Sequence, residues 1–170
     1  MIMQEIEGLG PAWRDHLIED FARSELFDRT FQEGMDLVEE TAAYLDGVGR
    51  QESKLLSRNA ALAYAGESMR LTTRLMQLAS WLLVQRAVRE GDMAPAAACE
   101  ARYRLAEEAQ EGEAGPGELP HALVRLADRA ERLYERARHL DRRMYVEGAS
   151  GETANPVLSH LDRLKSAFGG

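Results

Sequence analysis

Apolar residues recur at helical spacing along most of the chain, and this pattern predicts four helical stretches followed by a tail. The first stretch covers about 25–45, with a short helix opened by Pro11 possible before it. Its apolar face consists of Phe27, Phe31, Met35, Val38, Ala42 and Leu45. The Asp-Gly-Val-Gly segment at 46–49 predicts a left-handed cap and a turn after this helix.

The second stretch, about 52–90, contains no proline or strong break and predicts one long helix with two apolar faces. At about 1.5 Å per residue such a helix would be on the order of 58 Å long. One apolar set repeats every seven residues, as in a coiled coil: Leu55, Leu62, Met69, Met76 and Leu83. A second set is rotated away from it: Leu71, Leu75, Leu78 and Leu82. One buried stripe cannot hold both sets, so we expect the helix to be central in a bundle or partly at a subunit interface.

The last long helix has the clearest apolar repeat in the sequence. Gly91 predicts the end of the preceding helix, and a shorter helix at about 95–110 and an acidic loop at 111–118 come between. Pro120 suits a first helical turn. Spacings of four and three then alternate without a miss through Leu119, Leu123, Leu126, Ala130, Leu133, Ala137, Leu140 and Met144. Short turns between long helices favour antiparallel neighbours, so the pattern predicts an antiparallel helical bundle.

The chain divides into a helical bundle domain at 1–147, with a short N-terminal lead at 1–24, and a C-terminal segment at 148–170. From 148 to 155 the composition turns to Gly, Ser, Thr and Asn, which is typical of a flexible linker. After it comes a short amphipathic face formed by Val157, Leu161, Leu164 and Phe168. A helix of about a dozen residues is marginal in water. We therefore expect this tail either to dock on its own bundle or to enter the groove of a partner.

Composition and charge narrow the classes of function. The 170 residues suffice for one domain with a real core. A net charge of -8 argues against nucleic acid and against an anionic membrane surface as partners. No apolar run is long enough to span a bilayer, and the N-terminus has no signal-peptide pattern. Cys99 is the only cysteine, which excludes an internal disulfide. These features predict a cytoplasmic protein.

Residues with catalytic or metal-binding chemistry are few, and a simpler structural explanation exists for each. Glu118 and His121 have the Glu-x-x-His spacing of bundle metal sites, but they lie at a helix start and have no second copy. Glu135 and His139 lie off the apolar seam, where surface ion pairing explains them better. Cys99 is explained by packing in an Ala-rich stretch. Phosphate-binding and nucleophile motifs are absent from the sequence. We therefore expect no catalytic residue, no metal and no cofactor.

Two helical surfaces are candidates for binding a protein partner. The polar strip of the second stretch includes Arg70, Arg74, Gln77 and Trp81. Tryptophan and arginine are enriched at binding hot spots, although packing beneath a neighbouring helix would explain Trp81 equally well. The last helix carries seven arginines: Arg125, Arg129, Arg132, Arg136, Arg138, Arg142 and Arg143. A docking stripe for an acidic partner is one interpretation, but interleaved Asp and Glu residues favour a solvated face with ion pairs.

Several blocks of the sequence also resemble a known protein family. The longest block spans 67–83 (ESMRLTTRLMQLASWLL) and continues through 85–88 and 90–91. Shorter blocks are FQEGMDLVEE at 31–40, YLDG at 44–47 and AALAYA at 60–65, with Asn-Pro-Val at 155–157 and Ala-Phe at 167–168 near the end. These blocks resemble the RcdA family of alphaproteobacteria, the regulators of CtrA degradation. The resemblance is dense across 21–93, whereas 94–150 resembles the family mainly in helix pattern.

The resemblance implies a small dimeric three-helix-bundle protein with a flexible C-terminal extension and no catalysis of its own. Family members act as adaptors of the ClpXP protease. They dock on protease that a receiver-domain protein has primed, and they deliver cargo such as cell-cycle transcription regulators. A further adaptor that senses cyclic di-GMP can bind in turn. The expected fold class is therefore all-α, an antiparallel three-helix bundle of long helices with an extra shorter helix and a flexible C-terminal tail.

The expected binding residues follow from the helical faces. We expect partners to bind at Arg70, Arg74, Gln77, Trp81, Val157, Leu161, Leu164 and Phe168. We expect Leu71, Leu75, Leu78 and Leu82 to lie in the core or at a dimer interface. Two alternatives to the adaptor remain: a structural or scaffold dimer unrelated to proteolysis and, less favoured, a metal-binding helical-bundle enzyme.

Overall fold

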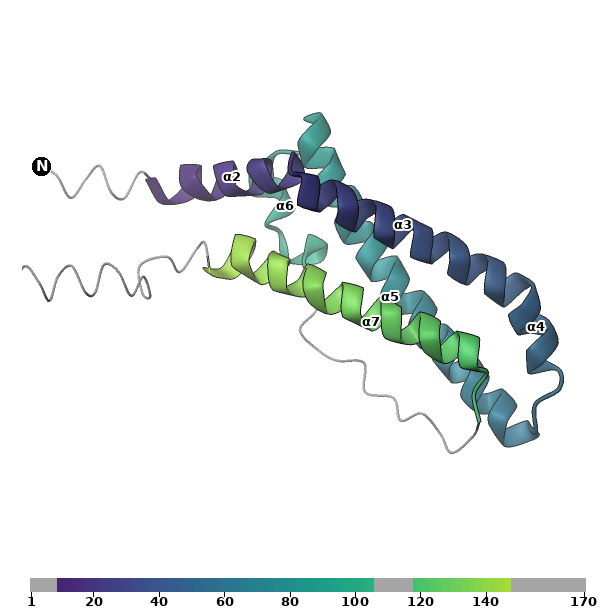
Figure 1. The fold of residues 1–170 in the computed structure, drawn as a ribbon. Coiled ribbons are helices and arrows are strands. Elements are labelled where there is room, and N and C mark those ends of the chain that lie inside the picture. The colour runs from purple at the N-terminus through teal and green to yellow at the C-terminus, as the bar shows by residue number, and fades with distance from the viewer. Residues whose placement is uncertain (1–8, 106–117, 148–170) are drawn as a thin grey trace, which may run out of the picture.

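The computed structural model describes residues 9–105 and 118–147, and these residues form helices and no strand (Figure 1). The helices are α2 (Leu9–Ala22), α3 (Glu25–Asp46), α4 (Val48–Ser53), α5 (Arg58–Glu90), α6 (Pro95–Ala98) and α7 (His121–Arg142). Single turns, η1 (Ala101–Tyr103) and η2 (Arg143–Glu147), complete the described elements. The predicted all-α bundle is confirmed. Within these residues, no helix is both apolar enough and long enough to cross a bilayer.

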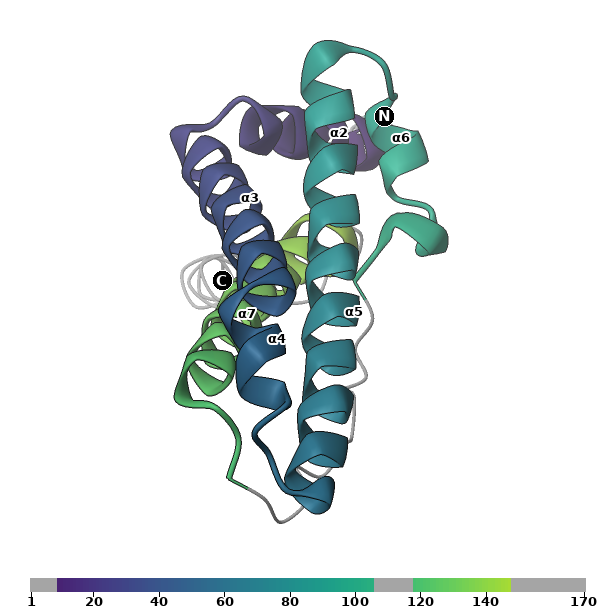
Figure 2. The same cartoon turned by 90° about the vertical axis from the view of Figure 1, so that its right-hand side faces the viewer.

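Three long helices, α3, α5 and α7, form the bundle, and α2 and α6 cover one end of it (Figures 1 and 2). Helix α3 runs antiparallel to the other two: its early residue Asp28 pairs with Arg89 near the end of α5. Helices α5 and α7 run in the same direction, because Arg74 pairs with Glu131 and residues further along both helices meet in turn. The long connection at 91–120 makes this parallel arrangement possible, whereas the short link between α4 and α5 reverses the chain.

The helix ends have identifiable caps. The Ser24 hydroxyl accepts a hydrogen bond from the backbone N–H of Phe27 at 3.1 Å, and Ser57 caps α5 in the same way. Gly91 ends α5 in the left-handed conformation, with φ of 80°, as its position in the sequence predicts.

The turn after α3 differs from the prediction. Gly47 has φ of -110°, so the predicted left-handed cap is wrong, and the chain continues directly into α4. Gly49 allows this continuation, because a Cβ there would lie 2.7 Å from the ring of Tyr44. The Tyr44 hydroxyl then donates to Glu52 at 2.9 Å and ties α4 to α3. The predicted unbroken helix from 52 is also wrong, because the chain leaves α4 after Ser53 and α5 begins only at Arg58.

The predicted helix at 95–110 is wrong over its described part. Only the four residues of α6 and the three of η1 are helical there. The backbone is extended at Glu100 and Arg104, which turns the chain toward the bundle. Leu105 is then buried, and the Arg104 side chain reaches Asp141 on α7. Tertiary contacts therefore override the helix propensity of this Ala-rich stretch.

The core lies between the three long helices. The predicted repeat of α7 is confirmed, because its central residues are buried and Leu119 and Leu140 pack partly against them. Helix α5 contributes Leu71, Leu75, Leu78 and Leu82, all of which are buried within the single chain. At the centre, Gly34 permits close approach, because a Cβ there would lie 2.6 Å from Leu82.

Candidate protein-binding site

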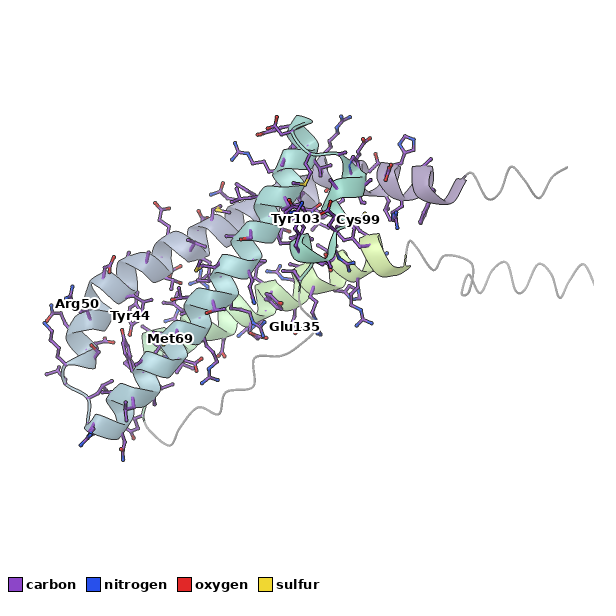
Figure 3. All side chains as sticks on the ribbon, turned by 180° about the vertical axis from the view of Figure 1, so that it is seen from behind. Tyr44, Arg50, Met69, Cys99, Tyr103 and Glu135 are labelled. Atoms are coloured by element: carbon purple, nitrogen blue, oxygen red, sulfur yellow. The ribbon has the colours of Figure 1, made fainter. Side chains whose placement is uncertain are left out.

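The other apolar set of α5 faces solvent and forms what we call the outer ridge: Leu62, Met69, Met76 and Leu83. These side chains, with Leu55 just before the helix, are 52 to 88% exposed. The ridge runs for about 31 Å at 1.5 Å per residue. Figure 3 looks onto α5 and labels Met69 along it. Exposed apolar side chains in such a continuous row mark protein-interaction surfaces.

A groove lies on the α3 side of the ridge, and we call it the α3–α5 groove. It encloses a cavity of about 320 Å³. Its apolar walls are formed by Val38, Ala42 and Leu45 of α3 and by Leu75, Met76 and Ala79 of α5. Met76 belongs both to this wall and to the outer ridge.

A second cavity, of about 530 Å³, lies on the opposite side of α5, against the chain at 102–105. Figure 2 shows this arrangement, with α3 on one side of α5 and α6 with the following connection on the other. Met76, Gln77 and Val84 line the α5 side, and Tyr103 faces them. The Gln77 Oε1 atom is buried here without a hydrogen-bond partner among the described residues.

A buried polar cluster fixes the connection onto the bundle. The Asp141 carboxylate accepts a hydrogen bond from Trp81 Nε1 at 3.0 Å. The same carboxylate accepts from Nε and Nη2 of Arg104 at 3.0 and 2.9 Å. Asp141 and Trp81 are each only 1% exposed. A buried carboxylate needs this complete set of donors, so the cluster is a structural joint between α5, α7 and the connection.

Tyr145 and Cys99 lie close to this cluster, and both are affected by burial. Gln85 Nε2 donates to the Tyr145 hydroxyl at 2.8 Å, and burial raises the pKa of that hydroxyl. Burial also raises the pKa of the Cys99 thiol, with Arg14 acting weakly in the opposite direction. A raised pKa disfavours the thiolate that a nucleophilic cysteine requires.

The predicted polar strip on α5 does not form one accessible surface. Trp81 lies in the core with its N–H on Asp141, so the prediction that it binds a partner is corrected. Arg74 is also buried: its guanidinium lies 3.9 Å from the ring centroid of Tyr134 and pairs with Glu131 at 3.0 Å. Arg74 therefore packs between α5 and α7. Arg70 and Gln77 are partly exposed.

Arg129 and Arg136 of α7 form ion pairs with α3, as the solvated-face interpretation predicts. Arg136 pairs with Glu33 at 2.5 Å, and Arg129 pairs with Glu40 at 2.8 Å. Such exposed pairs contribute little stability, on the order of 0–1 kcal/mol each. Acidic side chains are therefore interleaved with arginines on this face.

The described residues contain no group of three or more His, Cys, Asp or Glu side chains placed to hold a metal ion. Glu118 and His121 are exposed at the start of α7. Glu135 pairs with Arg138 at 3.0 Å. The tail residues Val157, Leu161, Leu164 and Phe168 lie outside the described residues.

Sequence reasoning missed the α3–α5 groove. Periodicity assigns residues to faces of a helix, but a groove depends on how two helices approach each other. The sequence did contain a related signal, the heptad set from Leu55 to Leu83. Once the other apolar set of α5 fills the core, the heptad set must be exposed on the surface beside the groove.

The fold and its surfaces define a class of protein: an all-helical bundle with an exposed apolar ridge, flanked by grooves. Comparison with known proteins places it further. The family model "Protein of unknown function (DUF1465)" matches residues 18–168, and the chain belongs to this family, which is that of RcdA. The crystal structure of RcdA from Caulobacter crescentus CB15 is 71% identical, with a TM-score of 0.64. That match covers 76% of this chain and 98% of the RcdA chain. No curated protein matches the chain.

Proposed function

We propose that this protein is an adaptor that tethers cargo to the primed ClpXP protease and so controls regulated proteolysis during the cell cycle. The observation that supports the proposal is the 71% identity to RcdA, which extends over 98% of the RcdA chain. The cargo would be cell-cycle transcription regulators, and a receiver-domain protein would prime the protease. An adaptor that senses cyclic di-GMP is a further proposed partner.

The described surfaces suit this role, because an adaptor needs binding surfaces and no chemistry of its own. Tethering raises the local concentration of cargo at the protease, by amounts that reach the millimolar range for short linkers. The outer ridge, the α3–α5 groove and the cavity beside 102–105 adjoin one another along α5 and share Met76. We place the adaptor in the cytoplasm, where the protease acts.

We also propose that the protein is a homodimer and that the outer ridge is the contact between its two copies. A two-fold axis near the middle of the ridge would place Met69 of one copy against Met76 of the other, and Met76 against Met69. Seven-residue spacing is the repeat that helices use to pack along one another. The ridge residues are exposed in the single chain, so the proposal accounts for apolar surface that the bundle itself leaves uncovered.

The adaptor proposal is tested by reconstituted proteolysis. Purified ClpXP, the receiver-domain protein and a fluorescent candidate cargo are combined with and without this protein. We expect faster loss of cargo only when both the adaptor and the primer are present. The proposal fails if no cell-cycle regulator from the same organism is degraded faster in the complete mixture.

A truncated form that ends at Glu147 serves as the matched comparison. It retains every described helix, so it should still unfold cooperatively when heating is followed by circular dichroism. We expect it to lose delivery of particular cargoes, since the removed segment carries the second predicted binding face. Equal delivery by both forms would contradict a role of residues 148–170 in binding.

A further inference from the structure

The α3–α5 groove has the size of a site for one or two side chains. Its volume of about 320 Å³ is at the lower end of the range of roughly 300–1,000 Å³ that is usual for ligand pockets. The walls between Val38 and Ala79 are almost entirely apolar. An apolar side chain entering the groove would therefore exchange contact with water for contact with mostly apolar side chains.

One buried polar group inside the groove has no partner. Thr41 lines the cavity and is only 3% exposed, yet its Oγ1 atom forms no hydrogen bond with any described residue. Other helical threonines of this chain bond to the carbonyl four residues earlier, as Thr30 does to Leu26 and Thr72 to Ser68, each at 2.8 Å. Thr41 therefore departs from the local pattern, and a buried unpaired hydroxyl is costly unless something else satisfies it.

Charge at the groove has one sign. Asp46 is the single charged residue among the described residues that line it, and its side chain bonds to no other described residue. Asp46 is also the last residue of α3. This end of the groove consequently favours a cation.

We propose that the α3–α5 groove binds a short segment of a partner protein in which an apolar side chain stands next to a lysine or arginine. The apolar side chain fills the cavity, the Thr41 hydroxyl hydrogen-bonds to the segment, and the cation pairs with Asp46. The assignment rests on the groove and not on the adaptor role, so each can fail without the other. The proposal also specifies which chemical groups the groove recognises, which the outer ridge alone does not.

The test uses two capped tetrapeptides and the full-length ¹⁵N-labelled protein. The first peptide reads alanine-leucine-arginine-alanine, and the control carries glutamate in place of arginine. We expect the arginine peptide to shift the amide resonances of Thr41, Ala42 and Ala79, with millimolar affinity. We expect the glutamate peptide to bind at least about threefold more weakly, as for removal of one partly exposed ion pair. Equal binding of both peptides, or shifts confined to other helices, would overturn the proposal.

Matched variants locate the binding. Asp46→Asn should weaken the arginine peptide about threefold and abolish its preference over the glutamate peptide. Asp36→Asn is the control, since Asp36 is exposed on the same helix and outside the groove. Ala42→Trp should fill the cavity and block binding, whereas Ala43→Trp, one residue along, should not. An Asp46→Asn variant that binds both peptides as before would also overturn the proposal.

The chain's own C-terminal residues include Leu164 between Arg163 and Lys165, so the occupant must be distinguished. The form that ends at Glu147 should bind the arginine peptide with the same affinity as the full chain. If it binds about tenfold more tightly, the tail already occupies the groove, and the assignment to a partner protein is wrong.

Discussion

At the scale of single residues, the molecule contains polar groups whose partners differ although their environments are alike. Thr30 and Thr41 are both buried on α3, but only Thr30 forms a hydrogen bond from its hydroxyl. Asp141 accepts bonds from two side chains, whereas the Oε1 atom of Gln77 accepts none. The difference separates polar groups that hold the fold together from polar groups that the described residues leave unpaired.

Replacing each threonine by valine should change stability in opposite directions. Thr41→Val removes an unpaired buried hydroxyl, so we expect the free energy of unfolding to rise by about 1 kcal/mol. Thr30→Val removes a made hydrogen bond and should lower it by about 1 kcal/mol. Both changes keep the β-branched shape. Urea denaturation measures both, and a loss of stability in both variants would contradict the assignment.

The buried hydroxyl of Tyr145 leads us to expect that the protein loses stability at alkaline pH. Burial raises the pKa of its hydroxyl above the ordinary value of 10.0. A group whose pKa is raised on folding contributes stability below its unfolded pKa, and that contribution is lost as pH rises through the folded pKa. We therefore expect stability to fall as pH rises above about 10.

Tyr145→Phe provides the comparison. It removes the bond with Gln85, so stability at neutral pH should fall, but the decline above pH 10 should become shallower. The slope of the free energy of unfolding against pH, measured between pH 9 and 11 for both forms, decides it. Some slope should remain, since burial also raises the pKa of Tyr44 and Tyr134. An unchanged slope would mean that Tyr145 ionises normally in the folded protein.

At the scale of elements, periodicity in the sequence predicted which residues share a helix face more accurately than it predicted where the helices begin and end. Six of the eight residues that the last repeat placed inside are buried and the other two, Leu119 and Leu140, are partly buried. Helix α3 ends within one residue of its predicted limit. The repeat could not decide which of the two α5 sets is buried, because that depends on where α3 and α7 pack. It also could not foresee the bend at Arg104, which exists because a carboxylate lies on α7, far away in sequence.

The candidate site was predicted less completely than the fold. Arg74 and Trp81 have the residue types of a binding hot spot, yet here they fill the space between α5 and α7. Residue type alone does not distinguish an exposed anchor from an internal one. The groove depends on a pair of helices and on a threonine without a bond, and neither feature is visible in one sequence.

The end of α5 offers a test of element boundaries. Gly91 adopts φ of 80°, which side chains with a Cβ rarely reach. We expect Gly91→Ala to lower the free energy of unfolding by about 1 kcal/mol, and Gly91→Asn to cost less, because asparagine tolerates this conformation. Thermal denaturation followed by circular dichroism measures both. Equal losses from alanine and asparagine would argue against strain at this cap.

At the scale of the whole molecule, the outer ridge is the feature that the single chain leaves uncovered. Met69→Glu should keep the fold, because the side chain is largely exposed, and should weaken the dimer at least about tenfold by burying a charge without a partner in an apolar contact. Val48→Glu is the control, since Val48 is an equally exposed apolar residue on α4. Sedimentation equilibrium measures both. If the wild-type chain is still monomeric at about 100 μM, the proposed interface is refuted.

The parallel course of α5 and α7 has a consequence for what the molecule can hold at one time. Because α7 does not double back, the described chain ends at Glu147 beside α2, at the pole opposite the link from α3 to α5 (Figure 1). The two poles are separated by the length of α5, about 50 Å for its 33 residues. A client seated near Asp46 and another bound beside α2 at the end of η2 would therefore approach from opposite directions without colliding. If α7 ran in the opposite direction, the described chain would end near Asp46, and the two clients would compete for space at one pole.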